Sequence, residues 1–268
     1  MKIKIFLTDA FTDEAFKGNP AGVCILDEKI SEKLMQNIAM EVNAAETAFV
    51  VKNEGGDFSI RYYSPEVEIP FCGHATIASA KVLMEKYNHT EINFTTHFDL
   101  KLSATKNENG IRLVFPLFDS EPFSSDKISE ALNISSYEDS KYCKNNQDLI
   151  VRVKDKDTLM NIKPDFGKLK AASSEFRGVC VTTKSDDNEY DFYSRFFAPA
   201  VGINEDPVTG SAHSVLAKYW SDILGKKELK AYQLSKRGGY LKLKILENNL
   251  LEVISNAKIV IEGELYTE

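Results

Sequence analysis

The chain has 268 residues, of which 43% are apolar and 27% are charged, and its formal net charge is -7. This composition is typical of a folded globular protein of about two domains, and it excludes disordered, collagen-like and membrane-spanning classes. The acidic balance and the absence of a sustained basic block argue against a nucleic-acid partner or an anionic membrane surface. The first residues alternate instead of forming a signal-peptide core, so we expect a cytoplasmic protein.

Strands dominate the predicted secondary structure, because apolar residues alternate with period two in several segments. These segments lie around residues 3–7, 100–104, 111–115 and 241–245. One surface helix is expected over residues 31–42, where Ser31 provides an N-cap and an apolar face follows at helical spacing. The segment 117–126 contains Pro122 and three serines without periodicity, which favours a linker near the middle of the chain.

The two halves of the chain resemble each other. At an offset of 134 residues, the segment 57–72 aligns without a gap with the segment 191–206. The identical pairs are Asp57/Asp191, Phe58/Phe192, Arg61/Arg195, Pro65/Pro199, Val67/Val201 and Ile69/Ile203. Each segment leads into a largely apolar stretch of good helix formers, residues 73–87 and 207–224. We therefore expect two similar halves, each with a buried helix.

These patterns predict an α+β fold of two pseudo-symmetric domains. Each domain is expected to be a curved, mostly antiparallel sheet wrapped around a central buried helix. The predicted limits are 1–116 for the N-terminal domain and 127–268 for the C-terminal domain, joined by the linker 117–126. Packing of the last strand on the N-terminal domain is left open.

Polar residues gather where the two predicted buried helices begin. His74 opens the first helix, and Asp206 and Ser211 lie at the start of the second. The first N–H groups of a helix lack intrahelical partners and suit a bound carboxylate. The predicted substrate-binding positions are Gly73, Ala75, Thr209 and Gly210.

Structural roles remain open for these polar residues. Asp206 followed by Pro207 has the pattern of an N-cap and a first helical residue, and His74 alone is also compatible with a buried structural histidine. An active site is favoured because the gap-free alignment places Cys72 of one half opposite Asp206 of the other, so that ionisable groups occur in both copies.

Glu46 follows the predicted surface helix and directly precedes an apolar strand. Apolar surroundings would suit its carboxyl group to take and return a proton. The alternative is an exposed charge at a strand end.

The four cysteines are widely spaced and show no spacing typical of a zinc site, so we expect no metal. Cys24 and Cys180 lie within apolar strand-like segments and are expected in the core. Cys72 differs because it directly precedes Gly73 and His74.

Five segments carry a family resemblance, in chain order. They are DAFTDEAFKGNPAGVCIL (9–26), NAAETAFV (43–50), RYYSPEVEIPFCGHATIASA (61–80), RFFAPAVGINEDPVTGSAHSVLAKYW (195–220) and QLSKRGG (233–239). Together they resemble the phenazine-biosynthesis PhzF-like isomerase family, which is related to diaminopimelate epimerase and proline racemase. GHAT followed by EDPVTGSA is the most specific part, whereas residues 100–175 carry no distinctive motif.

The resemblance implies a diaminopimelate epimerase-like fold of two barrel-like domains with the active site between them. It also implies an isomerase that uses no metal or organic cofactor and forms a homodimer. By the same resemblance, Glu46 acts as general base and acid, and His74, Asp206 and Ser211 complete the site.

One position departs from the racemase relatives, whose sites resemble a pair of cysteines, one from each half. Here the first position is Cys72 but the second is Asp206, so a symmetric two-thiol racemase is not expected. A single thiol base at Cys72 remains open.

The sequence thus predicts a cofactor-independent isomerase that moves a proton on a small carboxylated metabolite by general acid/base catalysis. The alternatives are an epimerase or racemase that uses Cys72 with a carboxylate, and a non-catalytic carboxylate-binding protein. The physiological substrate is not predicted.

Overall fold

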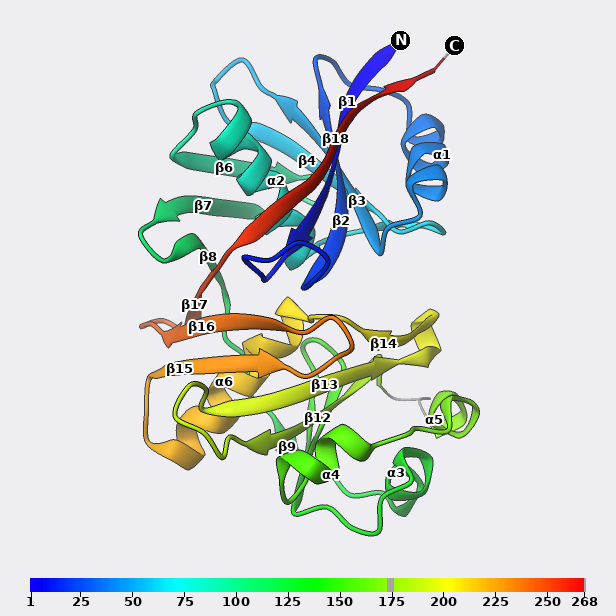
Figure 1. Cartoon of the computed structure of the whole chain (residues 1–268), viewed down its shortest axis with the longest axis vertical. Coiled ribbons are helices and arrows are strands. Elements are labelled where there is room, and N and C mark those ends of the chain that lie inside the picture. Colours follow the sequence, from blue (N-terminus) through cyan, green and yellow to red (C-terminus); the bar gives the residue numbers. More distant parts are fainter. Residues whose placement is uncertain (173–175, 268) are drawn as a thin grey trace. The chain divides into compact units, whose positions relative to one another are not determined.

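The computed structural model describes residues 1–172 and 176–267. The chain divides into two compact units, shown in Figure 1. Unit 1 consists of Met1–Val114 and Val253–Glu268, and unit 2 consists of Phe115–Glu252. Both units are built mainly from strands around one long helix, so the predicted α+β fold class is confirmed.

Unit 1 wraps a sheet around one central helix. Its strands are β1 (Lys2–Ala10), β2 (Asn19–Leu26), β3 (Glu46–Lys52), β4 (Phe58–Tyr63), β5 (Glu68–Ile69), β6 (Glu91–Thr96), β7 (Lys101–Asn107), β8 (Gly110–Pro116) and β18 (Ala257–Tyr266). Its helices are α1 (Glu32–Val42) and α2 (Gly73–Lys86). The pairing order is β18, β1, β2, β3, β4, β6, β7 and β8, with parallel pairing only between β2 and β3 and between β4 and β6 among these described pairs.

Unit 2 repeats this arrangement. Its strands are β9 (Glu121–Pro122), β10 (Asp139–Cys143), β11 (Asp148–Arg152), β12 (Gly178–Lys184), β13 (Phe192–Ala198), β14 (Ile203–Asp206), β15 (Glu228–Gln233), β16 (Gly239–Ile245) and β17 (Leu250–Ser255), the last of which ends beyond the unit. Its helices are α3 (Asp126–Leu132), α4 (Lys156–Asn161), α5 (Phe166–Ala172), the short 3-10 helix η1 (Pro199–Val201) and α6 (Gly210–Leu224). Strands β11 and β12 pair in parallel, as do β13 and β15.

The offset between the halves is not constant. Ile60 pairs with Thr96 across β4 and β6, and Ser194 pairs with Gln233 across β13 and β15. The first residues of these pairs are 134 positions apart, but the second are 137 apart, as are the helix starts Gly73 and Gly210. Asp206 pairs with Phe196 as Ile69 pairs with Tyr62, so unit 2 has three extra residues in the turn that precedes β14.

This insertion corrects the gap-free alignment of Cys72 with Asp206. Cys72 is the N-cap of α2, and the N-cap of α6 is Thr209, so Thr209 is the structural counterpart of Cys72. By the same offset, Ser211 corresponds to His74. Asp206 ends β14 and is the counterpart of Ile69, and the N-cap position of α6 is Thr209, so the alternative that Asp206 caps the helix is wrong.

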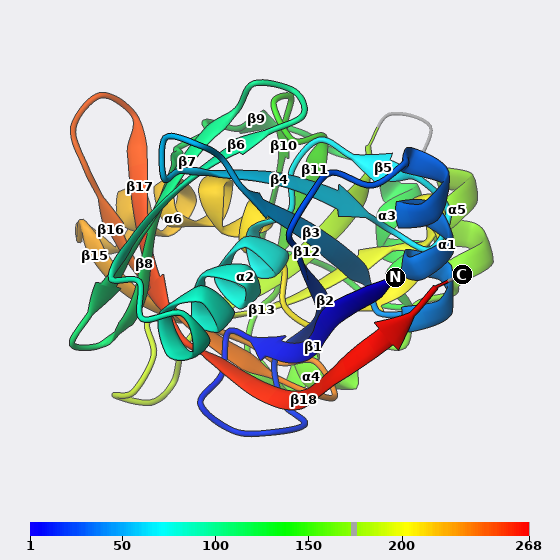
Figure 2. The same cartoon turned by 90° about the horizontal axis from the view of Figure 1, so that it is seen from above.

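The central helix α2 is buried on nearly every side, as its apolar pattern predicted. It packs on β1, β2, β3 and β18, and Figure 2 shows it surrounded by strands of unit 1. Its counterpart α6 packs on β15 and β16, and Trp220 near its C-terminal end is 1% exposed. A helix enclosed in this way has fixed ends, which holds the side chains at its start in place.

A repeated ion pair fixes the chain just before each central helix. The guanidinium of Arg61 makes two hydrogen bonds to Glu68, with Nε–Oε1 at 2.7 Å and a second at 2.6 Å. At the equivalent position, Arg195 forms the same two-bond pair with Glu205 at 2.8 and 3.1 Å. Each pair ties the longer strand of a hairpin to the short strand that leads into the helix.

The unit limits differ from the predicted domain limits at the linker, and the last strand, whose packing was left open, belongs to unit 1. The segment 117–126 is part of unit 2, because Glu121 and Pro122 pair with β10. The segment from Val253 onward returns to unit 1, where β18 pairs along the whole of β1. Figure 1 shows these two strands side by side, and the chain ends are joined there by a 2.5 Å hydrogen bond from the Met1 amino group to the carbonyl of Thr267.

Other local predictions are confirmed. The surface helix α1 covers 32–42, with Ser31 as N-cap accepting from the N–H of Leu34 at 3.3 Å. Cys24 and Cys180 are fully buried. Within the described residues, no helix is long and apolar enough to cross a membrane.

Candidate active site

Unit 1 brings together three of the predicted residues, which we call the unit 1 cluster: Glu46, Cys72 and His74. Glu46 is the first residue of β3, Cys72 occupies the N-cap position of α2, and His74 is the second residue of α2. His74 Nε2 lies 3.0 Å from Glu46 Oε2, and His74 Nδ1 lies 3.3 Å from Cys72 Sγ. The three side chains therefore form a continuous hydrogen-bonded chain from thiol to imidazole to carboxylate.

The parallel pairing of β2 and β3 explains this convergence. Ala21 lies opposite Glu46 in the sheet, and α2 packs on both strands. Asn19 at the start of β2 completes the surroundings, since its side-chain amide is fully buried 3.5 Å from His74 Nδ1. Exposure is low throughout the cluster, with 9% of the His74 side chain and 13% of the Glu46 side chain accessible.

Burial and charge oppose each other at His74. Burial disfavours the imidazolium, but the charges of Cys72 and Glu46 and the hydrogen bonds to both outweigh burial and raise the pKa of His74 well above its ordinary value. Burial also raises the pKa of the Cys72 thiol, which is therefore neutral at pH 7. With a neutral thiol, the anion that favours the imidazolium is the carboxylate of Glu46.

This arrangement can move protons. Each member of the unit 1 cluster is a group that binds and releases a proton, and neighbours lie within hydrogen-bond reach of one another. Once the His74 imidazolium has given up its Nε2 proton, a proton taken up by Glu46 can pass to it through the Nε2–Oε2 contact without any large displacement. The cluster thus supplies a buried acid/base pair with a thiol at its far end.

Unit 2 carries the other predicted residues around the start of α6. Thr209 donates its hydroxyl to Asp206 Oδ2 at 2.5 Å and its N–H to Gln233 Oε1 at 2.9 Å. Gln233 is fully buried and donates to the carbonyl of Asp206 at 2.8 Å. These bonds hold the segment between β14 and α6 against β15, so that Gln233 fixes the position of Asp206.

A charged pair lies beside Ser211 in unit 2. Arg177 donates to both carboxylate oxygens of Asp148, at 3.1 and 2.8 Å, and to the hydroxyl of Ser211 at 3.0 Å. Asn146 donates to the carbonyl of Ser211 at 3.2 Å. Ser211 is therefore held from its side chain and from its backbone.

Asp148 makes the stability of the protein depend on pH. Burial raises its pKa to about 6, although Arg177 favours the charged form; the charge of Asp206 adds to the increase. A carboxyl group with a higher pKa in the folded than in the unfolded chain stabilises the fold below its unfolded pKa, and this contribution falls as the pH rises towards 6. The difference from the ordinary value of 3.8 corresponds to up to about 3 kcal/mol.

The variant Asp148→Asn is accordingly expected to flatten this dependence. Between about pH 4 and pH 7, wild-type protein should lose more unfolding free energy than the variant, by up to about 3 kcal/mol. Urea unfolding followed by circular dichroism at several pH values measures the difference. Parallel stability curves for the two proteins would contradict the assignment.

The four predicted substrate-binding positions differ in whether their backbone N–H groups already contact an acceptor. Gly73 and Gly210 are the first residues of α2 and α6, where helix N–H groups have no intrahelical acceptor. The N–H of Ala75 faces the Cys72 sulfur and lowers the pKa of that thiol, although burial outweighs the effect. The N–H of Thr209 is taken by Gln233, which leaves the glycine positions as the better anion donors.

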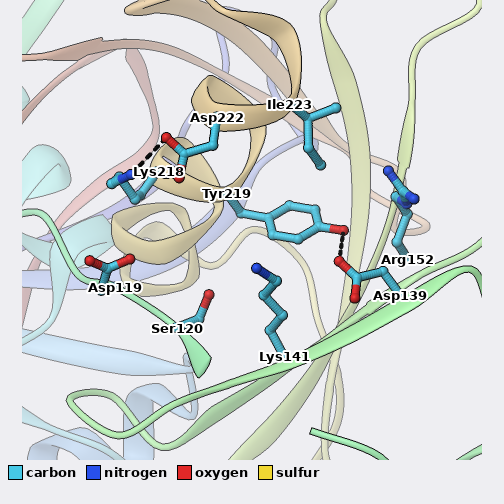
Figure 3. Close-up of a pocket in the computed structure, with 9 residues that line it drawn as sticks. All are labelled: Asp119, Ser120, Asp139, Lys141, Arg152, Lys218, Tyr219, Asp222 and Ile223. Atoms are coloured by element: carbon cyan, nitrogen blue, oxygen red, sulfur yellow. Dashed lines mark hydrogen bonds and ion pairs between the residues drawn. The ribbon is translucent and has the colours of Figure 1, made fainter. Parts of the chain in front are cut away.

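A separate pocket in unit 2 has a different character. Its volume is about 230 Å³, and it lies beside the C-terminal half of α6, including Lys218 and Tyr219 (Figure 3). Tyr219 donates to Asp139 at 2.8 Å, and Lys218 pairs with Asp222. Tyr219 is eight residues from Ser211, about 12 Å along the helix, so this pocket does not contain the predicted site residues.

Sequence reasoning missed Asn19, Asp148, Arg177 and Gln233. Asn19 and Gln233 lie in segments that carry the family resemblance, but nothing in the pattern gave them a role. Asp148 lies in the stretch without distinctive motifs, and its contact with Arg177 depends on the parallel pairing of β11 with β12. The only signal in the sequence for Asp148 was its position as a polar residue directly before the apolar residues of a strand.

Comparison with known proteins identifies the family. The model of the PhzC-PhzF family, described as phenazine biosynthesis-like protein, matches residues 8–264. The chain belongs to this family. It is 41% identical to phenazine biosynthesis-like domain-containing protein 2 of Mus musculus and 40% identical to an uncharacterized isomerase of Halalkalibacterium halodurans, each covering 99% of both chains.

Solved structures agree with this family membership. A PhzF-family protein of Enterococcus faecalis has a TM-score of 0.91 and 40% identity, with both chains fully covered. A hydroxyproline epimerase from Agrobacterium vitis has a TM-score of 0.63 with 9% identity, covering 98% of this chain and 92% of the other, and shares the fold alone. The predicted diaminopimelate epimerase-like fold and the predicted isomerase class are confirmed.

Proposed function

We propose that the protein is a cofactor-independent isomerase that moves a proton on a small carboxylated metabolite. The observation that carries this proposal is the buried hydrogen-bonded chain of Cys72, His74 and Glu46 at the start of α2. Family membership supports an isomerase but leaves the substrate and the mechanism open.

In the proposed reaction, Glu46 removes a proton from a carbon next to an unsaturated or carboxyl-stabilised centre. The C–H bond breaks, an O–H bond forms on Glu46, and the electron pair moves into the conjugated system of the substrate. A proton then reaches a different carbon, either directly from Glu46 or from the His74 imidazolium, which afterwards recovers a proton from Glu46, so that the product is an isomer. No oxidant or other reactant is needed.

The residues of unit 2 are proposed to serve the same substrate. Ser211 and the N–H at Gly210 would donate to negative charge that develops on the substrate, and Asp206 would relay a proton. Support comes from the repeat itself, since each unit presents a polar set at the start of its central helix. The substrate carboxylate would bind the helix N–H groups at Gly73 and Gly210.

The experiment that tests the proposal is solvent exchange. The protein is incubated in D2O with a panel of small carboxylic acids that carry a proton next to a double bond or a carboxylate. Enzyme-dependent deuterium uptake, detected by NMR and mass spectrometry, is the expected result. Ligands that bind without exchange or product would instead favour the alternative of a non-catalytic carboxylate-binding protein.

An epimerase or racemase that uses Cys72 as a base is the second candidate, favoured by the 3.3 Å contact between its sulfur and His74. Under the proposed isomerase mechanism, Cys72→Ala is expected to retain exchange within about 10-fold of wild type, because Glu46 performs the abstraction. Exchange rates of Cys72→Ala and of the control Cys143→Ala measure this. A loss of more than about 100-fold in Cys72→Ala alone would transfer the role of base to the thiol.

The oligomeric state is proposed from the family resemblance as a homodimer. Light scattering coupled to size-exclusion chromatography tests it directly. A mass of 30.1 kDa would indicate a monomer and contradict it.

A further inference from the structure

The unit 1 cluster has the donor atoms of a metal site. Two groups of three His, Cys, Asp or Glu residues, among those the structure describes, bring their ligand atoms within 4.8 Å of one another. One is Glu46, Cys72 and His74, and it offers a sulfur, a nitrogen and an oxygen. These are the donor types that Zn²⁺ takes in proteins, with a thiolate and an imidazole as its preferred ligands.

The distances within this group fit a tetrahedral ion. At ordinary Zn–N, Zn–O and Zn–S lengths, tetrahedral ligands lie about 3.3 Å apart for nitrogen and oxygen and about 3.6 Å apart for nitrogen and sulfur. The structure places His74 Nε2 3.0 Å from Glu46 Oε2 and 3.8 Å from Cys72 Sγ. Small side-chain adjustments therefore suffice to direct all three atoms at one ion.

Asn19 supplies support of the kind that metal-binding histidines use. Its side-chain amide lies 3.5 Å from His74 Nδ1, and in the orientation that points its oxygen at the ring it accepts from the Nδ1–H. That hydrogen bond leaves the Nε2 lone pair for the ion and fixes the plane of the ring. Three protein ligands leave a fourth tetrahedral position for water or a carboxylate.

The other group, Glu32, Glu68 and His97, is a poorer site. Arg61 occupies both carboxylate oxygens of Glu68 and also contacts Glu32 at 3.0 Å, so a cation already neutralises these acids. The side chain of Glu32 is 70% exposed, which keeps it hydrated. This group therefore serves as an internal comparison for the unit 1 cluster.

We infer that Glu46, Cys72 and His74 form a site for Zn²⁺ and similar soft divalent cations, and that occupation of this site inhibits the protein. Binding forms bonds from the ion to sulfur, nitrogen and oxygen, and the Cys72 thiol releases its proton to the solvent together with any proton on His74 Nε2. The ion then occupies the lone pairs of the proton-transfer chain. The binding part of this inference does not depend on the proposed isomerase reaction, whereas the inhibition part rests on it.

Titration of the metal-free full-length protein with Zn²⁺ and Co²⁺ tests the site. Expected results are one strongly bound Zn²⁺ per chain, proton release that calorimetry detects in buffers of different ionisation enthalpy, and a thiolate-to-Co²⁺ charge-transfer absorption. Cys72→Ser and His74→Gln are expected to weaken Zn²⁺ binding at least about 100-fold. Cys143→Ser and His97→Gln are matched controls that should bind as wild type does.

Several results would overturn the inference. One is equal Zn²⁺ affinity in Cys72→Ser and wild type, provided that circular dichroism shows both proteins folded. Another is a Co²⁺ complex without thiolate absorption, or loss of binding in His97→Gln. Zn²⁺ binding in a protein without any exchange activity would refute the proposed function alone, and exchange that persists at saturating Zn²⁺ would refute inhibition alone.

Discussion

Replacing Glu46 with glutamine is expected to lower deuterium exchange into the substrate by at least about 10³-fold. Glutamine has almost the same shape but cannot accept a proton, so the variant removes the base without leaving a cavity. Its amide can still contact His74 Nε2, which lies 3.0 Å from the carboxylate in the wild type. Substrate binding should therefore change little.

The matched control for this variant is Glu54→Gln, which removes the same charge from an exposed position after β3. Initial exchange rates in D2O, measured by NMR at saturating substrate, compare the three proteins. Glu54→Gln should match wild type. Exchange by Glu46→Gln at more than about a tenth of the wild-type rate would remove Glu46 from its proposed role.

Replacing Trp220 with alanine is expected to destabilise the protein by about 3–5 kcal/mol, the usual cost of removing a large buried aromatic side chain. Trp220 is 1% exposed, stacks on Phe192 at 5.6 Å and donates its indole N–H to Thr182 at 3.0 Å. It anchors the same helix that carries Ser211 at its start, so the loss would also loosen the residues around Ser211.

Urea unfolding followed by far-UV circular dichroism measures this effect without relying on the fluorescence of the only tryptophan. Trp220→Phe is the graded control. It keeps an aromatic ring against Phe192 but loses the hydrogen bond to Thr182, and an intermediate loss is expected because some of the buried volume remains. A change below about 1 kcal/mol in the alanine variant would show that the site repacks.

Periodic patterns predicted the framework of the fold because burial leaves a regular mark on sequence. Helix α2 could be predicted from residues that are apolar around the whole helix, and Ser31 marked the start of α1. The repeat was visible because β4 and β13 carry similar residues. Each of these strands also pairs with the strand before it in the same register. Each of these features depends on residues close together in the chain.

The details of the site depended on distant contacts, and there the sequence failed. The three extra residues before β14 leave no mark in a gap-free alignment, so Asp206 was placed opposite Cys72, although its structural counterpart is Ile69. The pairing of Arg177 with Asp148 joins two strands whose neighbouring residues show no pattern. His213 is fully buried, and burial lowers its pKa to about 4, although its hydrogen bond to the Thr209 carbonyl acts in the opposite direction. Its imidazole therefore stays neutral at pH 7.

The return of β18 to unit 1 has a consequence for folding during synthesis. Unit 2 is one continuous segment, whereas unit 1 lacks a ten-residue strand until the ribosome has passed residue 266. Until then β1 lacks one of its two neighbours, and its backbone groups on that side must be solvated or shielded by a chaperone. Unit 1 can therefore be completed only after the whole of unit 2 has been synthesised.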